Sequence, residues 1–149
     1  NGTEVTELPL ENETMVETIV LLNRKPSVHQ MSLFPEPFEM IKAGKKTIEL
    51  RLWDEKRQKL KIGDTILFTN TANGEILKTT VLHLHRFSSF KDLYRTLPLL
   101  KCGYTEDTIH TADASDMEQY YSCEEQEKYG VVGIELSLTA PLAGEASAD

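Results

Sequence analysis

Alternating apolar and polar residues predict five β-strands along this chain. In the segment 46–52, Ile48, Leu50 and Leu52 fall on one face of an extended chain, and most of the residues between them are polar. A similar alternation begins at Val28 and recurs after groups of turn-forming residues. The predicted strands span residues 28–33, 46–52, 65–69, 75–87 and 131–138.

Proline, glycine and capping residues predict helices between these strands. Pro35 suits the first turn of a helix and Gly44 suits the position after its end. The helix between them has Phe34, Phe38 and Ile41 on its apolar face. Further helical segments are predicted where a side chain can cap the first turn, at Ser88 or Ser89, Thr105, Ser115 and Ser122.

The order of these elements predicts an α+β fold. Asn73-Gly74 is a hairpin signal, so the strands 65–69 and 75–87 are expected to pair antiparallel. Strands joined by tight turns, with helices inserted among them, favour a small mixed or antiparallel β-barrel with short helices packed at its ends. A doubly wound parallel sheet would need regular βαβ alternation, which this chain does not have.

The predicted domain covers residues 28–138. Residues 1–27 are interpreted as an N-terminal extension, in which the apolar run 19–22 could add one strand. Residues 139–149 are small and polar and are predicted to form a mobile tail. No apolar run reaches the ~20 residues of a membrane helix, and no secretory signal is present, so we expect a cytoplasmic protein without a membrane partner.

Charge is distributed unevenly along the chain. The net charge is −8, yet residues 27–101 carry eight acidic and thirteen basic side chains, a net +5, and residues 102–149 carry a net −10. A basic middle segment can present an anion-attracting face on an acidic protein. We therefore expect an electropositive site, with an ordinary mixed, solvated surface as the alternative.

The cysteines and histidines do not predict a metal site. Cys102 and Cys123 form no CxxC motif, and two free thiols are favoured over a disulfide in a reducing cytosol. His83 and His85 share one face of a strand but have no third ligand at a suitable spacing. We expect neither a metal nor a cofactor, and we interpret His85 and Arg86 as candidate phosphate or base contacts, the alternative being a solvent-facing strand end.

The charged residues of the segment 44–51 are the main candidates for chemistry. Glu49 between Lys46 and Arg51 can be held ionised, and a lysine near other cations can be shifted toward its neutral form. With the hydroxyl of Thr47, these groups are enough for acid–base or nucleophilic chemistry on a carbonyl. The alternative is an exposed strand face whose ion pairs contribute only ~0–1 kcal/mol.

The pattern Gly44-x-Lys46-x-x-Glu49-x-Arg51, after a helix that contains Glu36-Pro37-Phe38, resembles the signature of ASCH domains. The resemblance extends from about residue 28 to 138 and fits the compact bacterial branch of that family. It implies a PUA-like β-barrel with a cleft that binds RNA or a modified nucleoside or nucleotide. A related branch hydrolyses N4-acetylcytidine with a lysine at the position of Lys46 and a threonine where this chain has Glu49.

Two classes of function remain open. The first is recognition of RNA or a modified nucleotide by a binding module without catalysis, with ligand contacts from Lys46, Arg51, His85, Arg86 and Tyr129. The second is a hydrolase, either an amidohydrolase or a ribonuclease, with Lys46, Glu49 and Thr47 as catalytic residues. Trp53 could also stack on a base, although a single tryptophan after a strand more often packs. If Lys46 and Glu49 form a partly exposed ion pair, Lys46→Ala is expected to leave the stability of the fold nearly unchanged.

Overall fold

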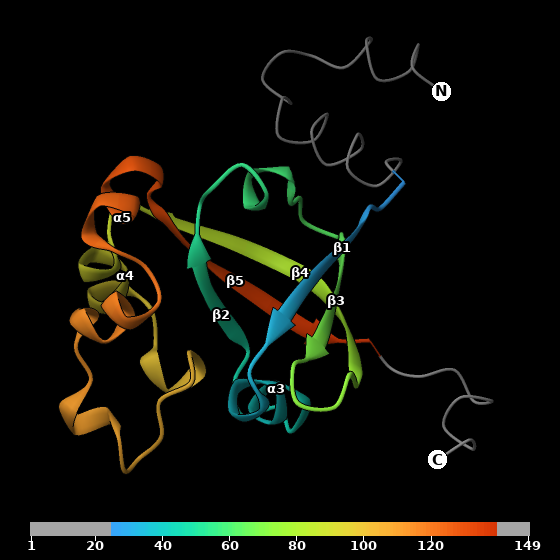
Figure 1. Cartoon of the computed structure of the whole chain (residues 1–149), viewed down its shortest axis with the longest axis horizontal. Coiled ribbons are helices and arrows are strands. Elements are labelled where there is room, and N and C mark those ends of the chain that lie inside the picture. Colours follow the sequence, from blue (N-terminus) through green and yellow to red (C-terminus); the bar gives the residue numbers. More distant parts are fainter. Residues whose placement is uncertain (1–24, 140–149) are drawn as a thin grey trace, which may run out of the picture.

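The computed structural model describes residues 25–139, which form a curled half-barrel sheet with helices on its flank and at one end (Figure 1). The sheet order is β1-β3-β4-β5-β2; β1 and β3 pair in parallel and every other neighbouring pair is antiparallel. The strands are β1 (Val28–Leu33), β2 (Ile48–Leu52), β3 (Thr65–Asn70), β4 (Ile76–Phe87) and β5 (Val131–Leu138). The predicted α+β class and mixed, barrel-like sheet are confirmed.

The helices divide into two groups. The first group is α3, which lies at one end of the barrel, whereas α4, α5 and the segment between them lie together beside β2 and β5 (Figure 1). We call residues 90–130 the helical segment. The helices are α3 (Pro35–Lys42), α4 (Phe90–Thr96) and α5 (Cys123–Tyr129), and the 3-10 helices are η2 (Arg57–Lys59), η3 (Leu99–Lys101), η4 (Ile109–Thr111) and η5 (Ala114–Gln119).

The two faces of the sheet contribute to two separate hydrophobic cores. Inside the half-barrel, Phe38 of α3 packs with Phe68 and Ile134 in a core from which water is excluded. The opposite face of β2 packs against the helical segment through Ile48, Leu50 and Leu52, as its alternation predicts. The other face of β2, which carries Glu49 and Arg51, is turned toward the barrel interior.

Register across the sheet supports this assignment of faces. Glu49 is paired with Ile134 of β5, and Arg51 is paired with Val132; both of these β5 residues belong to the core inside the half-barrel. Directly opposed residues of neighbouring strands point to the same face of a sheet. The charged positions of β2 therefore lie at the margin of an apolar interior.

Several of the predicted element boundaries are confirmed. Ser89, and not Ser88, caps α4, since its side chain accepts a hydrogen bond from the amide of Asp92. The capping box predicted at Ser122 is present and involves Glu125. The strand predicted over 46–52 begins two residues later, at Ile48.

Two of the predicted helix starts are wrong. The capping box expected at Ser115 is formed instead by Asp113 and Asp116, because the aspartates offer the same three-residue spacing two positions earlier. Thr105 caps no helix; its amide donates to the hydroxyl of Thr108 in a turn, and the 3-10 helix η4 begins only at Ile109.

The described residues also bear on the predictions about thiols, membranes and the ends of the chain. Cys102 and Cys123 are both free, as expected. Within residues 25–139 no helix has the length and apolarity needed to cross a bilayer. The strand suggested at 19–22 and most of the tail predicted over 139–149 lie outside the described residues.

Gly130 joins α5 to β5 in a conformation that a side chain would strain. Its φ of +72° and ψ of −174° belong to a region that is essentially restricted to glycine, and a Cβ there would lie 3.0 Å from the carbonyl oxygen of Phe87. We predict that Gly130→Ala lowers the free energy of unfolding by ~3 kcal/mol in urea titrations.

The matched control is Gly74→Ala in the β3–β4 turn. Gly74 has a similar φ of +77°, but a Cβ there would meet nothing within 4 Å, so we expect a loss of only ~1 kcal/mol. Equal losses for the two variants would show that the contact with Phe87 has no energetic consequence.

Candidate functional site

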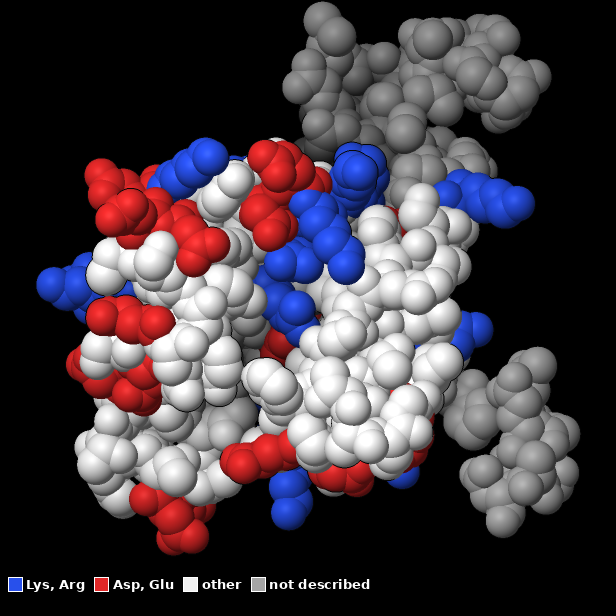
Figure 2. Space-filling model, in the orientation of Figure 1, with Lys and Arg blue, Asp and Glu red and all other residues white. Residues whose placement is uncertain are grey.

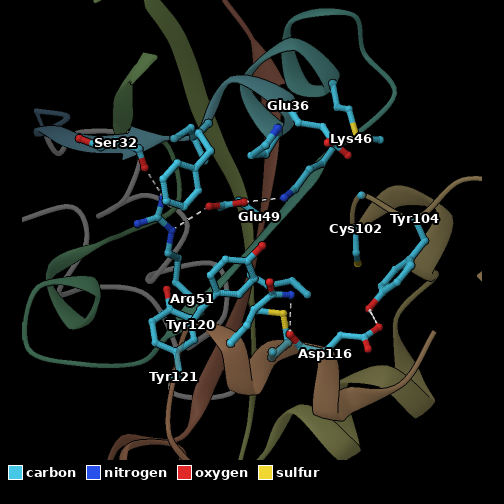
Figure 3. Close-up of a pocket in the computed structure, with 18 of the residues that line it drawn as sticks. Ser32, Glu36, Lys46, Glu49, Arg51, Cys102, Tyr104, Asp116, Tyr120 and Tyr121 are labelled. Atoms are coloured by element: carbon cyan, nitrogen blue, oxygen red, sulfur yellow. Dashed lines mark hydrogen bonds and ion pairs between the residues drawn. The ribbon is translucent and has the colours of Figure 1, made fainter. Parts of the chain in front are cut away.

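A pocket of about 540 Å³ opens between the half-barrel and the helical segment. Figure 2 shows a hollow on this face, with Lys and Arg side chains gathered around its upper part and uncharged side chains over most of its two walls. The barrel wall includes Phe34 and Met40, whereas the helical segment contributes Tyr104, Tyr120 and Tyr121. The pocket therefore combines apolar and aromatic walls with a charged floor, which Figure 3 shows in detail.

The floor of the pocket is a carboxylate held between two cations. Glu49 Oε1 lies 2.8 Å from Lys46 Nζ, and Glu49 Oε2 accepts a hydrogen bond of 2.7 Å from Arg51 Nε (Figure 3). The side chains of Glu49, Lys46 and Arg51 are only 6, 11 and 14% exposed. We call these three residues the ion clamp. The expectation of a partly exposed pair was wrong, because this face of β2 is turned toward the half-barrel interior and its charged side chains lie at the floor of the pocket.

Arg51 also links the two edges of the sheet. Its Nη2 donates a hydrogen bond of 2.7 Å to the backbone carbonyl of Ser32 in β1. Because β1 and β2 stand at opposite ends of the strand order, this contact crosses the open side of the half-barrel. The ion clamp thus lies at the seam where the barrel does not close.

The charges of the ion clamp stabilise one another in spite of their burial. Burial alone would raise the pKa of Glu49, but Lys46 and Arg51 outweigh it and hold that pKa below its ordinary value. Burial alone would lower the pKa of Arg51, but Glu49 raises it above its ordinary value. The carboxylate therefore stabilises the fold above the pKa it has in the unfolded chain, and this contribution is lost as the pH falls through its lower folded pKa.

Gly103 lies beside the side chain of Lys46. With φ of +114°, Gly103 adopts a conformation that favours glycine, and a Cβ there would lie 3.4 Å from Lys46 Cδ. The backbone of the helical segment thus passes directly over the aliphatic part of the lysine.

The wall formed by the helical segment contains a chain of hydrogen bonds. The hydroxyl groups of Tyr94 and Tyr104 lie 2.7 Å apart, and Tyr104 donates a bond of 2.6 Å to Asp116 Oδ2. Burial, together with these bonds to the protonated phenol, raises the pKa of Tyr104 far above its ordinary value.

Burial also raises the pKa of the Cys102 thiol to about 11, although Lys46 opposes the shift. Cys102 is therefore a protonated thiol at neutral pH, and not a ready nucleophile.

The structure brings together only some of the residues that the sequence singled out. Lys46, Glu49 and Arg51 meet in the ion clamp, but Thr47 does not line the pocket. The amide of Thr47 donates to the carbonyl of Lys101, and its own carbonyl accepts from Leu136, so this residue connects elements through its backbone.

The other predicted contacts lie elsewhere. Arg86 and Tyr129 line a separate groove of about 430 Å³, together with Trp53. His85 Nε2 lies 2.8 Å from Glu135 Oε1, and His85 is paired with Gly133, which places it on the face of the sheet opposite to Arg86. Within residues 25–139, no group of three or more metal-ligating side chains is assembled.

Several pocket residues were not identified from the sequence. Phe34 was assigned to a helical core stripe, yet it precedes α3 and is 62% exposed at the pocket. Tyr120 also lines the pocket and is 53% exposed. Tyr104 and Asp116 carried no signal, because only the folded helical segment brings them to the pocket. An aromatic residue just before a proline-initiated helix could have directed attention to Phe34.

The pocket itself is not electropositive. The charged side chains that line it are two cations, Lys46 and Arg51, and three carboxylates, Glu36, Glu49 and Asp116. The expectation of an electropositive site is therefore wrong for this pocket. The basic residues of the segment 27–101 lie largely outside it, because only two of them reach the pocket wall.

Burial of the ion clamp predicts that it matters for stability. Lys46→Met would leave Glu49 buried with one cation fewer, and breaking a buried ion pair in this way costs ~3–5 kcal/mol. We expect a loss of that order in the free energy of unfolding, measured by urea titration at pH 7. A loss below ~1 kcal/mol would contradict the inferred burial.

The control is Arg95→Met in α4, which removes the cation of a surface pair. Arg95 lies 2.6 Å from Asp92, but these side chains are 68 and 42% exposed. Exposed pairs contribute at most ~1 kcal/mol, so this variant is expected to unfold at nearly the wild-type urea concentration.

Comparison with known proteins supports the resemblance seen in the sequence. The family model for the ASCH domain matches residues 31–140. The crystal structure of the hypothetical protein PH0355 is 36% identical, with a TM-score of 0.64 over 75% of this chain and 99% of that one. The solution structure of protein PF0455 from Pyrococcus furiosus is 33% identical, with a TM-score of 0.56 over 76% of this chain and 99% of that one.

A more distant structure shares the fold alone. The crystal structure of ASCH from Zymomonas mobilis is 16% identical, with a TM-score of 0.54 over 74% of this chain and 67% of that one. No curated protein matches the chain significantly. The match of a family model to most of the chain, together with two relatives covered almost completely, shows that this chain belongs to the ASCH domain family, with its PUA-like fold.

Proposed function

We propose that this protein recognises RNA or a modified nucleotide by holding one nucleoside unit in the pocket between the half-barrel and the helical segment. The observation that carries this proposal is the ion clamp at the floor of a pocket with aromatic walls. A volume of about 540 Å³ falls within the range of ~300–1,000 Å³ that is usual for small-molecule sites.

The aromatic residues at the pocket suit a flat ligand. Phe34 precedes α3 on the barrel side, and Tyr120 follows η5 in the helical segment, so that the two come from different walls. Both side chains are more than half exposed. Unpaired bases bind to proteins largely by stacking on such rings. Exposed aromatic side chains on two walls therefore favour a nucleobase over a flexible aliphatic ligand.

The floor of the pocket can donate hydrogen bonds to acceptor atoms of a ligand. Both carboxylate oxygens of Glu49 are engaged by Lys46 and Arg51. A lysine ammonium has three N–H donors and an arginine has five, so the ion clamp leaves donors for a ligand. Carbonyl oxygens, including that of an acylated base, are suitable partners. The three carboxylates at the pocket disfavour a phosphate at this position.

A hydrolase is the second candidate, and one observation favours it. Lys46 Nζ and Glu49 Oε1 lie 2.8 Å apart in a sheltered pocket, an arrangement that could orient a water molecule for attack on an amide. The hydroxyl of Thr47 lies outside the pocket lining, and the thiol of Cys102 is protonated. A catalytic mechanism would therefore depend on activated water, and recognition without turnover is the simpler proposal.

Removal of either exposed ring should weaken nucleoside binding. Stacking of a base on an aromatic side chain contributes ~1–3 kcal/mol, so we expect Phe34→Ala and Tyr120→Ala each to raise Kd by about 5- to 150-fold. The measurement is titration calorimetry with the four common ribonucleosides and N4-acetylcytidine. Ile76→Ala is the control, because Ile76 is 61% exposed in β4 but does not line the pocket.

The same samples separate the two candidate functions. Binding of a nucleoside that is unaffected by both ring variants would contradict the proposed site. Release of acetate from N4-acetylcytidine, detected by chromatography and lost in Glu49→Gln, would favour the hydrolase. The folding of Glu49→Gln is checked by circular dichroism, because that variant leaves two cations without their carboxylate.

A further inference from the structure

The cations that an RNA backbone requires are found beside the pocket and not within it. Arg86 and Lys128 line the groove of about 430 Å³ near the end of β4, with Trp53 and Tyr129 as its aromatic residues. We infer that this groove is a second binding site, which takes the phosphate and base next to the nucleoside held in the pocket. This inference rests on the proposed function and specifies single-stranded RNA, and not a free nucleoside, as the ligand.

The geometry of the sheet connects the groove to the pocket. Trp53 follows β2 at the position where alternation continues the face of Glu49 and Arg51, and it packs against the same interior core. Arg51 of β2 and Arg86 of β4 are both paired with Val132 of β5, so they share one face of the sheet. Two strand spacings of ~4.8 Å put their backbones about 10 Å apart, close enough for neighbouring nucleotides.

The groove combines stacking surface with positive charge. The guanidinium of Arg86 lies over the Trp53 ring, with Cζ 4.7 Å from the ring centroid, and Lys128 Nζ lies 5.0 Å from the centroid of Tyr129. An arginine placed over an aromatic ring can offer its outer face to a base and its N–H groups to a phosphate. The structure thus presents a preformed platform and does not require a loop to move.

The two cations of the groove are available to an anion. Within residues 25–139 neither Arg86 nor Lys128 forms an ion pair, whereas nearby Arg57 is bonded to Asp54 at 3.0 Å. Glu127 also lines the groove, which leaves a net charge of +1 there. The pocket, in contrast, has an excess of carboxylates. This difference in charge favours the groove over the pocket as the place where a phosphate binds.

The test measures RNA binding as a function of salt concentration. Fluorescein-labelled pentanucleotides of adenosine, cytidine and uridine are titrated with full-length wild type, Arg86→Gln and Lys128→Gln by fluorescence anisotropy. Each phosphate contact contributes about −0.7 to the slope of log Kobs against log[salt] for single strands. We expect each variant to lose about 0.7 from that slope and to bind about tenfold more weakly at low salt.

Two further variants show whether charge at this place is what matters. Lys78→Gln removes one positive charge from the opposite end of β4, where the side chain is also exposed, and should leave the slope unchanged. Arg86→Lys keeps the charge but not the planar group, so it should retain the slope and still bind more weakly. An equal loss of slope in Lys78→Gln would overturn the inference, because the effect would then reflect net charge alone.

The single tryptophan supplies an independent readout with unlabelled RNA. Trp53 is the only tryptophan in the chain and lies in the groove, so its emission should change with an unlabelled pentanucleotide but not with a nucleoside. One outcome would overturn the groove and retain the proposed function. In that outcome nucleosides bind, but pentanucleotides bind no more tightly than nucleosides and leave Trp53 emission unchanged. Pentanucleotides whose slope depends on Arg86, without any nucleoside binding, would retain the groove and overturn the proposed pocket ligand.

Discussion

The carboxylate of Glu49 is the point on which the architecture of this face depends. Its two oxygens hold Lys46 and Arg51, and Arg51 in turn reaches the carbonyl of Ser32 on the opposite edge of the sheet. An unpaired carboxylate buried to this extent would be costly, and two unpaired cations beside an apolar interior would be costly as well. Each charge is tolerated because the others are present, so the three residues behave as one unit that spans the open seam of the half-barrel.

That dependence explains why the pocket is polar without being positive. Glu49 cancels one of the two cations, and Glu36 and Asp116 add negative charge to the walls. What remains for a ligand are directed N–H donors in a partly desolvated space, where a hydrogen bond is stronger than in water. Such a floor selects neutral acceptors by their position. A diffuse positive field would instead attract any anion, and it would weaken as salt rises.

The sequence predicted the strands well because each has one apolar face, and the period-2 pattern records that face directly. The α+β class followed from their order, and Lys46, Glu49 and Arg51 were identified because they are close in sequence. Tyr104 and Tyr120 could not be placed, since the packing of the helical segment against β2 brings them to the pocket, and Phe34 was grouped with the apolar face of the helix that it precedes. The burial of Glu49 was missed because alternation indicates which face a residue occupies but does not show what covers that face.

The basic middle segment shows the limit of reasoning from summed charge. Residues 27–101 carry a net +5, yet several of these cations are neutralised where they lie: Lys42 by Glu75, Arg57 by Asp54 and Arg95 by Asp92. A phosphate responds to charges within about a Debye length of ~10 Å and not to a sum along the chain. Cations that keep no carboxylate partner, and that an aromatic ring holds in a fixed direction, therefore count for more than their number suggests. Among residues 25–139, Arg86 over Trp53 meets both conditions, and for that reason the electrostatics of this part of the chain are better described by its unpaired cations than by its net charge.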